Sequence, residues 1–327
     1  MIINSVAIAL SLITTLFFGW VFMMHFRKQK TGVKSPFIPD GKTLSDNKKT
    51  MGTAFACLLG SAVTFFATSF LFEKGQLVFS FCCVVFIASM CFVGFKDDRQ
   101  LDLMGKNVGE KTQNRLLGIM IVSLLFCVIS LASGIDTVVT LPLSTSKIRL
   151  SGAFGPTVAL FTLLACEGER ATGNKNNTEY VRAIIKLTAL LVVCAFEEKT
   201  HLMLLPSIYI GALAGGIFWT DFKKVLKIGF SDKYIITAMV ISACIATQNE
   251  GMAIFLFAFE ILCLLSKPVD MLGYKISKKH IFNRLPVDEH LKSAKLSDLK
   301  IKIFYSTITL LFAVSATAIR IILLKTQ

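Results

Sequence analysis

Long runs of apolar residues, separated by short polar stretches, dominate this 327-residue chain. A helix needs about 20 mostly apolar residues to cross the roughly 30 Å hydrocarbon core of a bilayer. Ten segments meet or approach this length, approximately residues 2–24, 53–72, 77–95, 116–133, 152–166, 181–196, 202–218, 234–247, 251–265 and 303–323. The fifth, sixth and eighth are short, which suits spans that other helices surround. The pattern predicts an all-α polytopic membrane protein with about ten transmembrane helices, forming a single integral membrane domain over residues 1–327.

The composition excludes a water-soluble domain and a disordered chain. Hydrophobic residues make up 54% of the sequence, charged residues make up 17% and the mean hydropathy is +0.66, whereas soluble domains carry about 25% charged residues. The first apolar segment lacks a small-residue cleavage site, so we expect a retained helix rather than a signal peptide. The nine cysteines lie in or beside apolar stretches without zinc-site spacing, which predicts small buried fillers.

The distribution of basic residues predicts the orientation. Loops at about 27–50, 96–115, 167–182, 219–233 and 267–302 hold 28 of the 35 Lys and Arg residues, and the alternate loops with the C-terminal tail hold five. Positive residues favour the cytoplasmic side, so we expect these five loops in the cytoplasm and both termini outside. The net charge of +14 then faces anionic lipid headgroups. We expect no nucleic-acid binding, because no basic patch is interleaved with exposed aromatic residues.

Two adjacent carboxylates, Asp97 and Asp98, end the third apolar segment in the sequence Gly-Phe-Lys-Asp-Asp. Neighbouring helical residues diverge by about 100°, so both can face one ion only if the helix unwinds there. One carboxylate could reach a metal or phosphate site while the other orients a neighbouring lysine. The alternative is a solvated helix end. Lys111 and Gln113, just before the fourth segment, could place a cation and an amide nearby.

The remaining cytoplasmic loops offer further polar groups. Loop 167–182 is rich in Asn and Gly and includes Asn176, loop 219–233 holds the acids Asp221 and Asp232, and the last loop is Lys-rich and reaches His290.

Two ionisable residues lie inside predicted spans. We expect Glu260 to face the bundle interior, where it serves catalysis or a structural role such as capping a broken helix before Pro268. We expect Lys186 to extend to the cytoplasmic edge.

These loops, in this order on ten spans, resemble the MraY family, the bacterial phospho-N-acetylmuramoyl-pentapeptide transferases within the polyprenyl-phosphate N-acetylhexosamine-1-phosphate transferases. The first loop ends in Thr-Met-Gly at 50–52, the Gly-Phe-x-Asp-Asp motif matches 94–98, and the Lys/Gln pair matches Lys111 and Gln113. The last loop matches with a Lys-rich run, Ile281-Phe282, Pro286 and His290. The resemblance covers nearly the whole chain.

The resemblance implies an MraY-like bundle with a catalytic face of cytoplasmic loops in the bacterial cytoplasmic (inner) membrane. It implies transfer of a phospho-N-acetyl-sugar from a UDP-N-acetyl-sugar to undecaprenyl phosphate, a polyprenyl phosphate lipid, with release of UMP and with Mg²⁺ as cofactor. Asp97 and Asp98 take the place of the catalytic pair, and Asp232 is the candidate metal ligand. The substrate contacts would be Lys111, Asn176 and His290. Members are often dimeric, which implies a homodimer.

The sequence departs from the family pattern at three places. The third cytoplasmic loop reads ATGNKNN over 171–177 and lacks the two aspartates of the family motif. In the fourth loop, Phe230 stands where the family has the aspartate of Met-Gly-Asp, which supplies a metal carboxylate. In the last loop, only His290 remains of the family's three histidines. Each change removes a group that acts on transition-state charge. Two hypotheses of function within this family therefore stay open. One is a divergent transferase, and the other is a catalytically silent homologue that acts as a scaffold or regulator of envelope synthesis. An unrelated transporter or channel is a third hypothesis, but the spans show no obvious inverted repeat.

Overall fold

The computed structural model describes residues 2–28, 52–71, 74–104, 112–135, 137–140, 146–173, 178–226, 228–277 and 287–325. Each of the ten predicted apolar segments falls on helix within these ranges. Five helical stretches of this described part are long and apolar enough to cross a membrane, namely Ile2–His25, Gln76–Arg99, Thr112–Ala132, Thr200–Phe222 and Asp298–Lys325. The all-α membrane architecture is therefore supported, whereas the number of ten spans stays a prediction.

The helices follow the predicted order along the chain. The first six are α1 (Ile2–Lys28), α2 (Thr53–Ala67), α3 (Lys74–Met104), α4 (Thr112–Ala132), α5 (Phe154–Ala171) and α6 (Glu179–Phe196). They are followed by α7 (Leu204–Ile217), α8 (Phe230–Ala246), α9 (Met252–Leu256), α10 (Ala258–Ser277), α11 (Val287–Ser293) and α12 (Asp298–Lys325). Short 3₁₀ turns occur at Ser69–Leu71, Ser151–Ala153 and Thr200–Met203, and a π turn at Phe218–Phe222.

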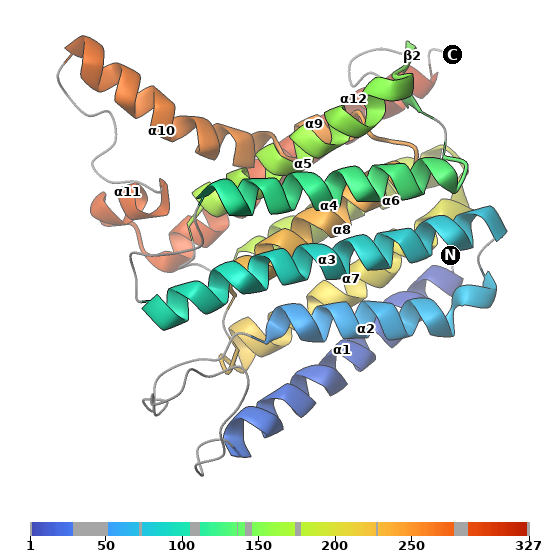
Figure 1. The fold of residues 1–327 in the computed structure, drawn as a ribbon, viewed down its shortest axis with the longest axis horizontal. Coiled ribbons are helices and arrows are strands. Elements are labelled where there is room, and N and C mark those ends of the chain that lie inside the picture. Colours follow the sequence, from blue (N-terminus) through green and yellow to red (C-terminus); the bar gives the residue numbers. More distant parts are fainter. Residues whose placement is uncertain are drawn as a thin grey trace.

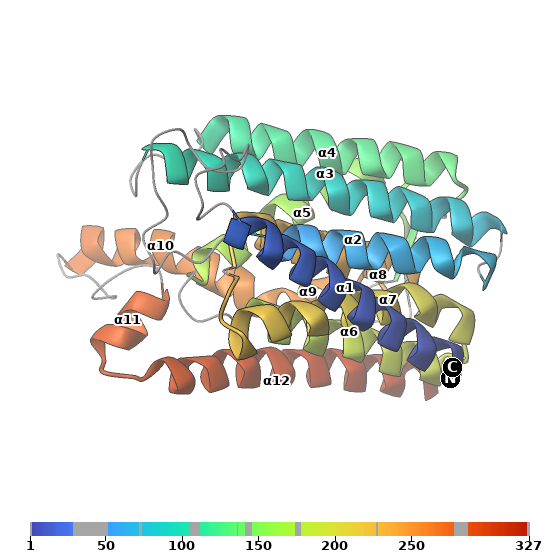
Figure 2. The ribbon, with the colours of Figure 1, turned by 90° about the horizontal axis from the view of Figure 1, so that it is seen from below.

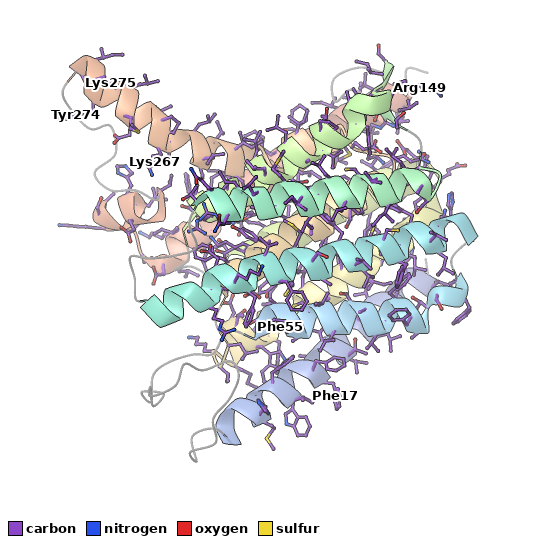
Figure 3. The ribbon with its side chains drawn as sticks, viewed as in Figure 1. Phe17, Phe55, Arg149, Lys267, Tyr274 and Lys275 are labelled. Carbon is purple, nitrogen blue, oxygen red and sulfur yellow. The ribbon has the colours of Figure 1, made fainter. Side chains whose placement is uncertain are left out.

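Helix α8 occupies the centre of the bundle (Figures 1 and 2). All its residues except the last are buried, which suits a helix that is enclosed on every side. Helices α3, α5, α6 and α7 pack around it, and α1, α4 and α12 present apolar side chains outward, as Phe17 does in Figure 3. All nine cysteines are buried and free, as expected for small apolar fillers.

The two ends of the bundle differ in structure. The N-terminus, the C-terminus and a β-hairpin lie at one end, which we call the outer end after the predicted orientation (Figures 1 and 2). The hairpin pairs β1 (Val138–Thr140) with β2 (Lys147–Arg149) in antiparallel register, Val138 opposite Arg149. The opposite end, here the cytoplasmic end, carries α11 and the projecting part of α10 with Lys267 and Lys275 (Figure 3).

The ninth predicted segment is broken rather than continuous. Helix α9 ends at Leu256 and α10 begins at Ala258, so the break falls at Phe257, whereas Pro268 lies inside α10. From this break α10 leaves the bundle toward the cytoplasmic end (Figure 1).

Candidate functional site

Asp98 is buried against the first turn of α8. Helix α3 continues without unwinding through this position to Met104, and the Asp98 side chain is 2% exposed. Its carboxylate accepts hydrogen bonds from the backbone N–H of Phe230 (2.7 Å), from the N–H of Ser231 (2.9 Å) and from the Ser231 hydroxyl (2.7 Å). The first N–H groups of a helix lack intrahelical partners and favour negative charge. Asp98 therefore caps α8 from a neighbouring helix.

Two glycines allow this close approach of α3 to α8. A Cβ atom on Gly94 would lie 2.5 Å from Cα of Ser231, and one on Gly229 would lie 2.5 Å from Oδ2 of Asp98. Neither position has room for a side chain. The Gly-Phe-x-Asp-Asp motif thus has a packing function in this chain, because its glycine brings the carboxylate onto the helix end.

Asp97 points to a different partner. It is fully buried and forms an ion pair with Arg170 near the end of α5. The Arg170 guanidinium carbon lies 4.1 Å from the centre of the Phe230 ring, within the range of a cation–π contact. The divergence predicted for adjacent helical acids is confirmed. The cation paired with Asp97 is Arg170 from the predicted loop 167–182, where a neighbouring lysine was expected.

Asp232 lies in the first turn of α8 and is also buried. The Tyr180 hydroxyl donates to its Oδ1, and the N–H of Gly229 donates to its Oδ2 over 2.7 Å. Burial raises the pKa of Asp232 to about 7, and the nearby Asp98 carboxylate adds to this rise against the two hydrogen bonds. Two of the sequence-predicted acids, Asp98 and Asp232, are thus brought together at the start of α8.

A buried ion network joins α5, α6 and α10 beside this site. Arg182 of α6 bonds Glu169 and Glu260, each over 2.6 Å. Lys186, one turn further along α6, bonds the same two carboxylates over 3.1 and 2.8 Å. All four side chains are 0% exposed. The expectation that Glu260 faces the interior is confirmed, whereas the expectation that Lys186 extends to the membrane edge is wrong, because two buried carboxylates hold it.

Lys233 and Glu179 extend the network to α8. The Lys233 ammonium lies 3.4 Å from Glu179 and donates to the carbonyl oxygens of Glu169 (2.7 Å) and Gly173. The whole network then contains three cations and three carboxylates, so its formal charge is zero. Burial alone would raise the pKa of Glu169, but the three surrounding cations lower it to about 2.

Several network atoms keep no hydrogen-bond partner among the described residues. They are Oε2 of Glu260, Oε2 of Glu179 and Nε of Arg182. A buried charged group that leaves some of its hydrogen bonds unmade carries a desolvation penalty. The network is therefore neutral in charge and incomplete in hydrogen bonding.

The other sequence-predicted site residues do not add to this cluster. Lys111 and Asn176 lie outside the described residues. His290 lies on α11, which packs against α12. The cluster instead includes Arg170 and Arg182, which sequence reasoning did not single out.

The donor set at the start of α8 does not fit a magnesium ion. Mg²⁺ takes carboxylate oxygens and water in an octahedral shell, but Asp98 already accepts three hydrogen bonds and Asp97 is paired with Arg170. Phe230 provides a ring at the position of the family's metal carboxylate. Within the described ranges, no group of three or more His, Cys, Asp or Glu side chains is arranged for a metal.

Comparison with known proteins links the chain to one kind of enzyme. No family model matches it. It is 21% identical to the phospho-N-acetylmuramoyl-pentapeptide-transferase of Anoxybacillus flavithermus over 315 residues, which cover 93% of this chain and 94% of the relative. The corresponding protein of Geobacillus kaustophilus is 19% identical over 312 residues, 94% of this chain and 95% of the relative. That of Halalkalibacterium halodurans is 21% identical over 224 residues, 68% and 69% of the two chains. The chain is therefore distantly similar, over most of its length, to phospho-N-acetylmuramoyl-pentapeptide transferases, which supports a distant MraY-like relationship.

Proposed function

We propose that this protein is a catalytically silent MraY-like homologue that acts as a scaffold or regulator of cell-envelope synthesis in the bacterial cytoplasmic membrane. The observation that carries the proposal is the pairing of Asp97 with Arg170 beneath the Phe230 ring. An arginine neutralises the carboxylate that the resemblance assigns to catalysis, and a phenylalanine stands at the sequence position of a metal carboxylate.

Phosphoryl transfer explains why this replacement matters. The phosphate groups of a UDP-N-acetyl-sugar and of undecaprenyl phosphate repel each other, and a metal ion with several carboxylates and lysines neutralises that charge. In this chain the Asp97 carboxylate is paired with an arginine and the Asp98 carboxylate accepts backbone hydrogen bonds. The acidic residues of the family's third loop have no counterpart in 171–177. Loss of one such group lowers a rate by about 10²–10³, and losses within one unit do not add simply.

The fold still suits association with envelope components. A bundle of this kind in the inner membrane would place Asp97 and the basic loops on the cytoplasmic side and both termini outside. It would retain contact with polyprenyl phosphate or a UDP-sugar without turnover, as a monomer or homodimer beside an active enzyme.

A divergent transferase is the second candidate, because Asp98 and Asp232 meet at one point near Asp97. It requires these acids to exchange their present partners for a metal and substrate on binding.

UMP release distinguishes the two candidates. The purified protein, undecaprenyl phosphate, Mg²⁺ and a panel of UDP-N-acetyl-sugars are incubated beside an authentic family enzyme and the Asp97→Asn variant. The silent homologue releases no UMP above the Asp97→Asn background, whereas the divergent enzyme releases it and loses the activity in Asp97→Asn. In cells, a silent scaffold predicts that the Asp97→Asn allele complements a deletion in proportion to its level in the membrane, since the substitution removes the carboxylate that pairs with Arg170.

A further inference from the structure

A cavity of about 440 Å³ opens at the outer end of the bundle, opposite the site at the start of α8. Its walls come from the start of α3, the end of α4 with the β-hairpin, the turn before α7, the end of α8 and the last part of α12. Polar side chains from these separate segments converge there, including Lys199, Gln248, Glu250 and Arg320. Phe79 and Ile245 add apolar surface.

The two cations of the cavity share one buried carboxylate. Arg320 bonds Oε1 of Glu197 through Nε (2.9 Å) and Nη2 (2.7 Å), and Lys199 lies 3.0 Å from Oε2. Glu197 is 3% exposed, whereas the Lys199 side chain is 30% exposed. One carboxylate thus fixes two positive groups, and both of these side chains line the cavity.

Positively charged residues are rare at the outer end of the bundle. The alternate loops and the C-terminal tail hold five of 35 Lys and Arg residues, and Arg320 is one of two more inside predicted spans. Topology disfavours such residues on the outer side. Two of these few cations nevertheless meet in one cavity, which topology alone does not explain.

The backbone at the rim adopts a conformation that favours glycine. Glu198 and Gln248 have φ angles of 57° and 56° at the ends of α6 and α8. The left-handed region at such helix ends is usually filled by Gly. Gln248 instead keeps a side chain that lines the cavity and accepts a hydrogen bond from Lys199 over 3.3 Å. A strained position that carries a cavity-lining amide points to a use for that amide.

We propose that this cavity binds a small zwitterion that carries one phosphate and one amine. The phosphate lies against Lys199 and Arg320, and the amine lies toward Glu250 and the Gln248 carbonyl group. The cavity wall carries both positive and negative side chains, which favours a zwitterion over a simple anion. The volume suits a small ligand, and the position at the end of a membrane bundle suits phosphoethanolamine chemistry. A lipid headgroup or a free phosphoethanolamine can supply this chemistry.

Calorimetric titration of the full-length protein in phosphatidylglycerol nanodiscs tests the proposal. O-phosphoethanolamine is compared with ethyl phosphate, which lacks the amine. We expect phosphoethanolamine to bind about 10-fold more tightly, and Glu250→Gln to remove this preference, because one charge-assisted bond corresponds to about that factor. Lys199→Gln should lower the affinity for both ligands about 10-fold. Nanodiscs of phosphatidylethanolamine separate the sources: competition from a lipid headgroup abolishes the titration, and a soluble ligand leaves it unchanged.

Two variants keep the test independent of folding. Gln248→Gly suits the left-handed backbone and should retain or raise the melting temperature while weakening phosphoethanolamine binding. Lys325→Gln removes an exposed cation of α12 outside the cavity wall and should leave binding unchanged. Absence of binding in phosphatidylglycerol nanodiscs, equal affinity for the two ligands, or an unaltered Lys199→Gln variant would overturn the proposal.

Discussion

Replacement of Glu260 by Gln tests the energetic role of the buried ion network. Oε1 of Glu260 accepts hydrogen bonds from both Arg182 (2.6 Å) and Lys186 (2.8 Å). Glu260→Gln retains the shape of the side chain and removes its charge. The network then changes from three cations and three carboxylates to a net charge of +1, in a region where the four central side chains are fully buried.

The magnitude follows from burial. Removal of one partner from a buried ion pair costs about 3–5 kcal/mol, because the remaining charge stays desolvated without compensation. We therefore expect Glu260→Gln to lower the free energy of unfolding by about 3–5 kcal/mol. The double variant Glu260→Gln/Lys186→Met restores neutrality and should recover a substantial part of this loss, since an uncharged replacement of a whole pair is often tolerated.

The assay is SDS-induced unfolding of the purified protein in mixed micelles, followed by tryptophan fluorescence and circular dichroism. Asp221→Asn is the matched control, because it breaks the Asp221–Lys302 pair (3.0 Å), whose side chains are 24% and 32% exposed. An exposed pair contributes about 0–1 kcal/mol. A Glu260→Gln variant as stable as Asp221→Asn, or a double variant less stable than both single variants, would refute the charge-balance reasoning.

Three further substitutions, with Gly118→Ala as a control, examine the residues packed at the start of α8. Gly94→Ala places a Cβ 2.5 Å from the Ser231 backbone. It should lower the free energy of unfolding by about 1–3 kcal/mol, which thermal melts would show as a lower melting temperature. Gly118→Ala is the control and should have little effect, because its Cβ would lie 3.5 Å from the Val93 side chain. Asp98→Ala leaves two N–H groups and the Ser231 hydroxyl without their acceptor. It should lower the free energy of unfolding by about 1–3 kcal/mol and speed amide hydrogen exchange in the first turn of α8. Unchanged exchange there would contradict the capping role of Asp98. Asp232→Asn tests pH dependence: a folded-state pKa of about 7, above the usual value near 4, means that the folded protein binds more protons between pH 4 and 7. Stability should therefore fall as pH rises through this window. Thermal melts of Asp232→Asn should show a smaller slope than those of the wild type, and the slope that remains belongs to Asp98, whose burial raises its pKa to about 6.

Hydropathy was sufficient to predict ten helical segments and their order, but not α11, whose sequence is mostly polar. Each apolar run falls on a helix because a buried or lipid-facing helix satisfies its own backbone hydrogen bonds. Hydropathy did not predict where the ninth segment breaks, because Phe257 is as apolar as its neighbours. The hairpin over 138–149 was also missed, since two strands of three residues give little periodic signal.

The ion network had a sequence signal that went unused. Glu179, Arg182 and Lys186 follow one another at spacings of three and four residues within or beside an apolar segment. Residues at these spacings share one face of a helix, and charges on one face of an intramembrane helix require partners inside the bundle. This pattern predicts interior carboxylates, although it does not identify Glu169 or Glu260, which lie on other helices.

The partners of Asp97 and Asp98 could not be predicted from their motif. The same Gly-Phe-x-Asp-Asp sequence suits a metal site or a helix cap, and the choice depends on residues 73 and more than 130 positions away. In this chain Phe230 removes a carboxylate and Arg170 adds a guanidinium that pairs with Asp97 and contacts the Phe230 ring. A site that had merely lost its metal ligands would leave Asp97 buried without compensation, which is unfavourable. The two residues instead compensate the charge together, so the altered site is a stable alternative arrangement, and this favours a retained structural role over a degraded enzyme.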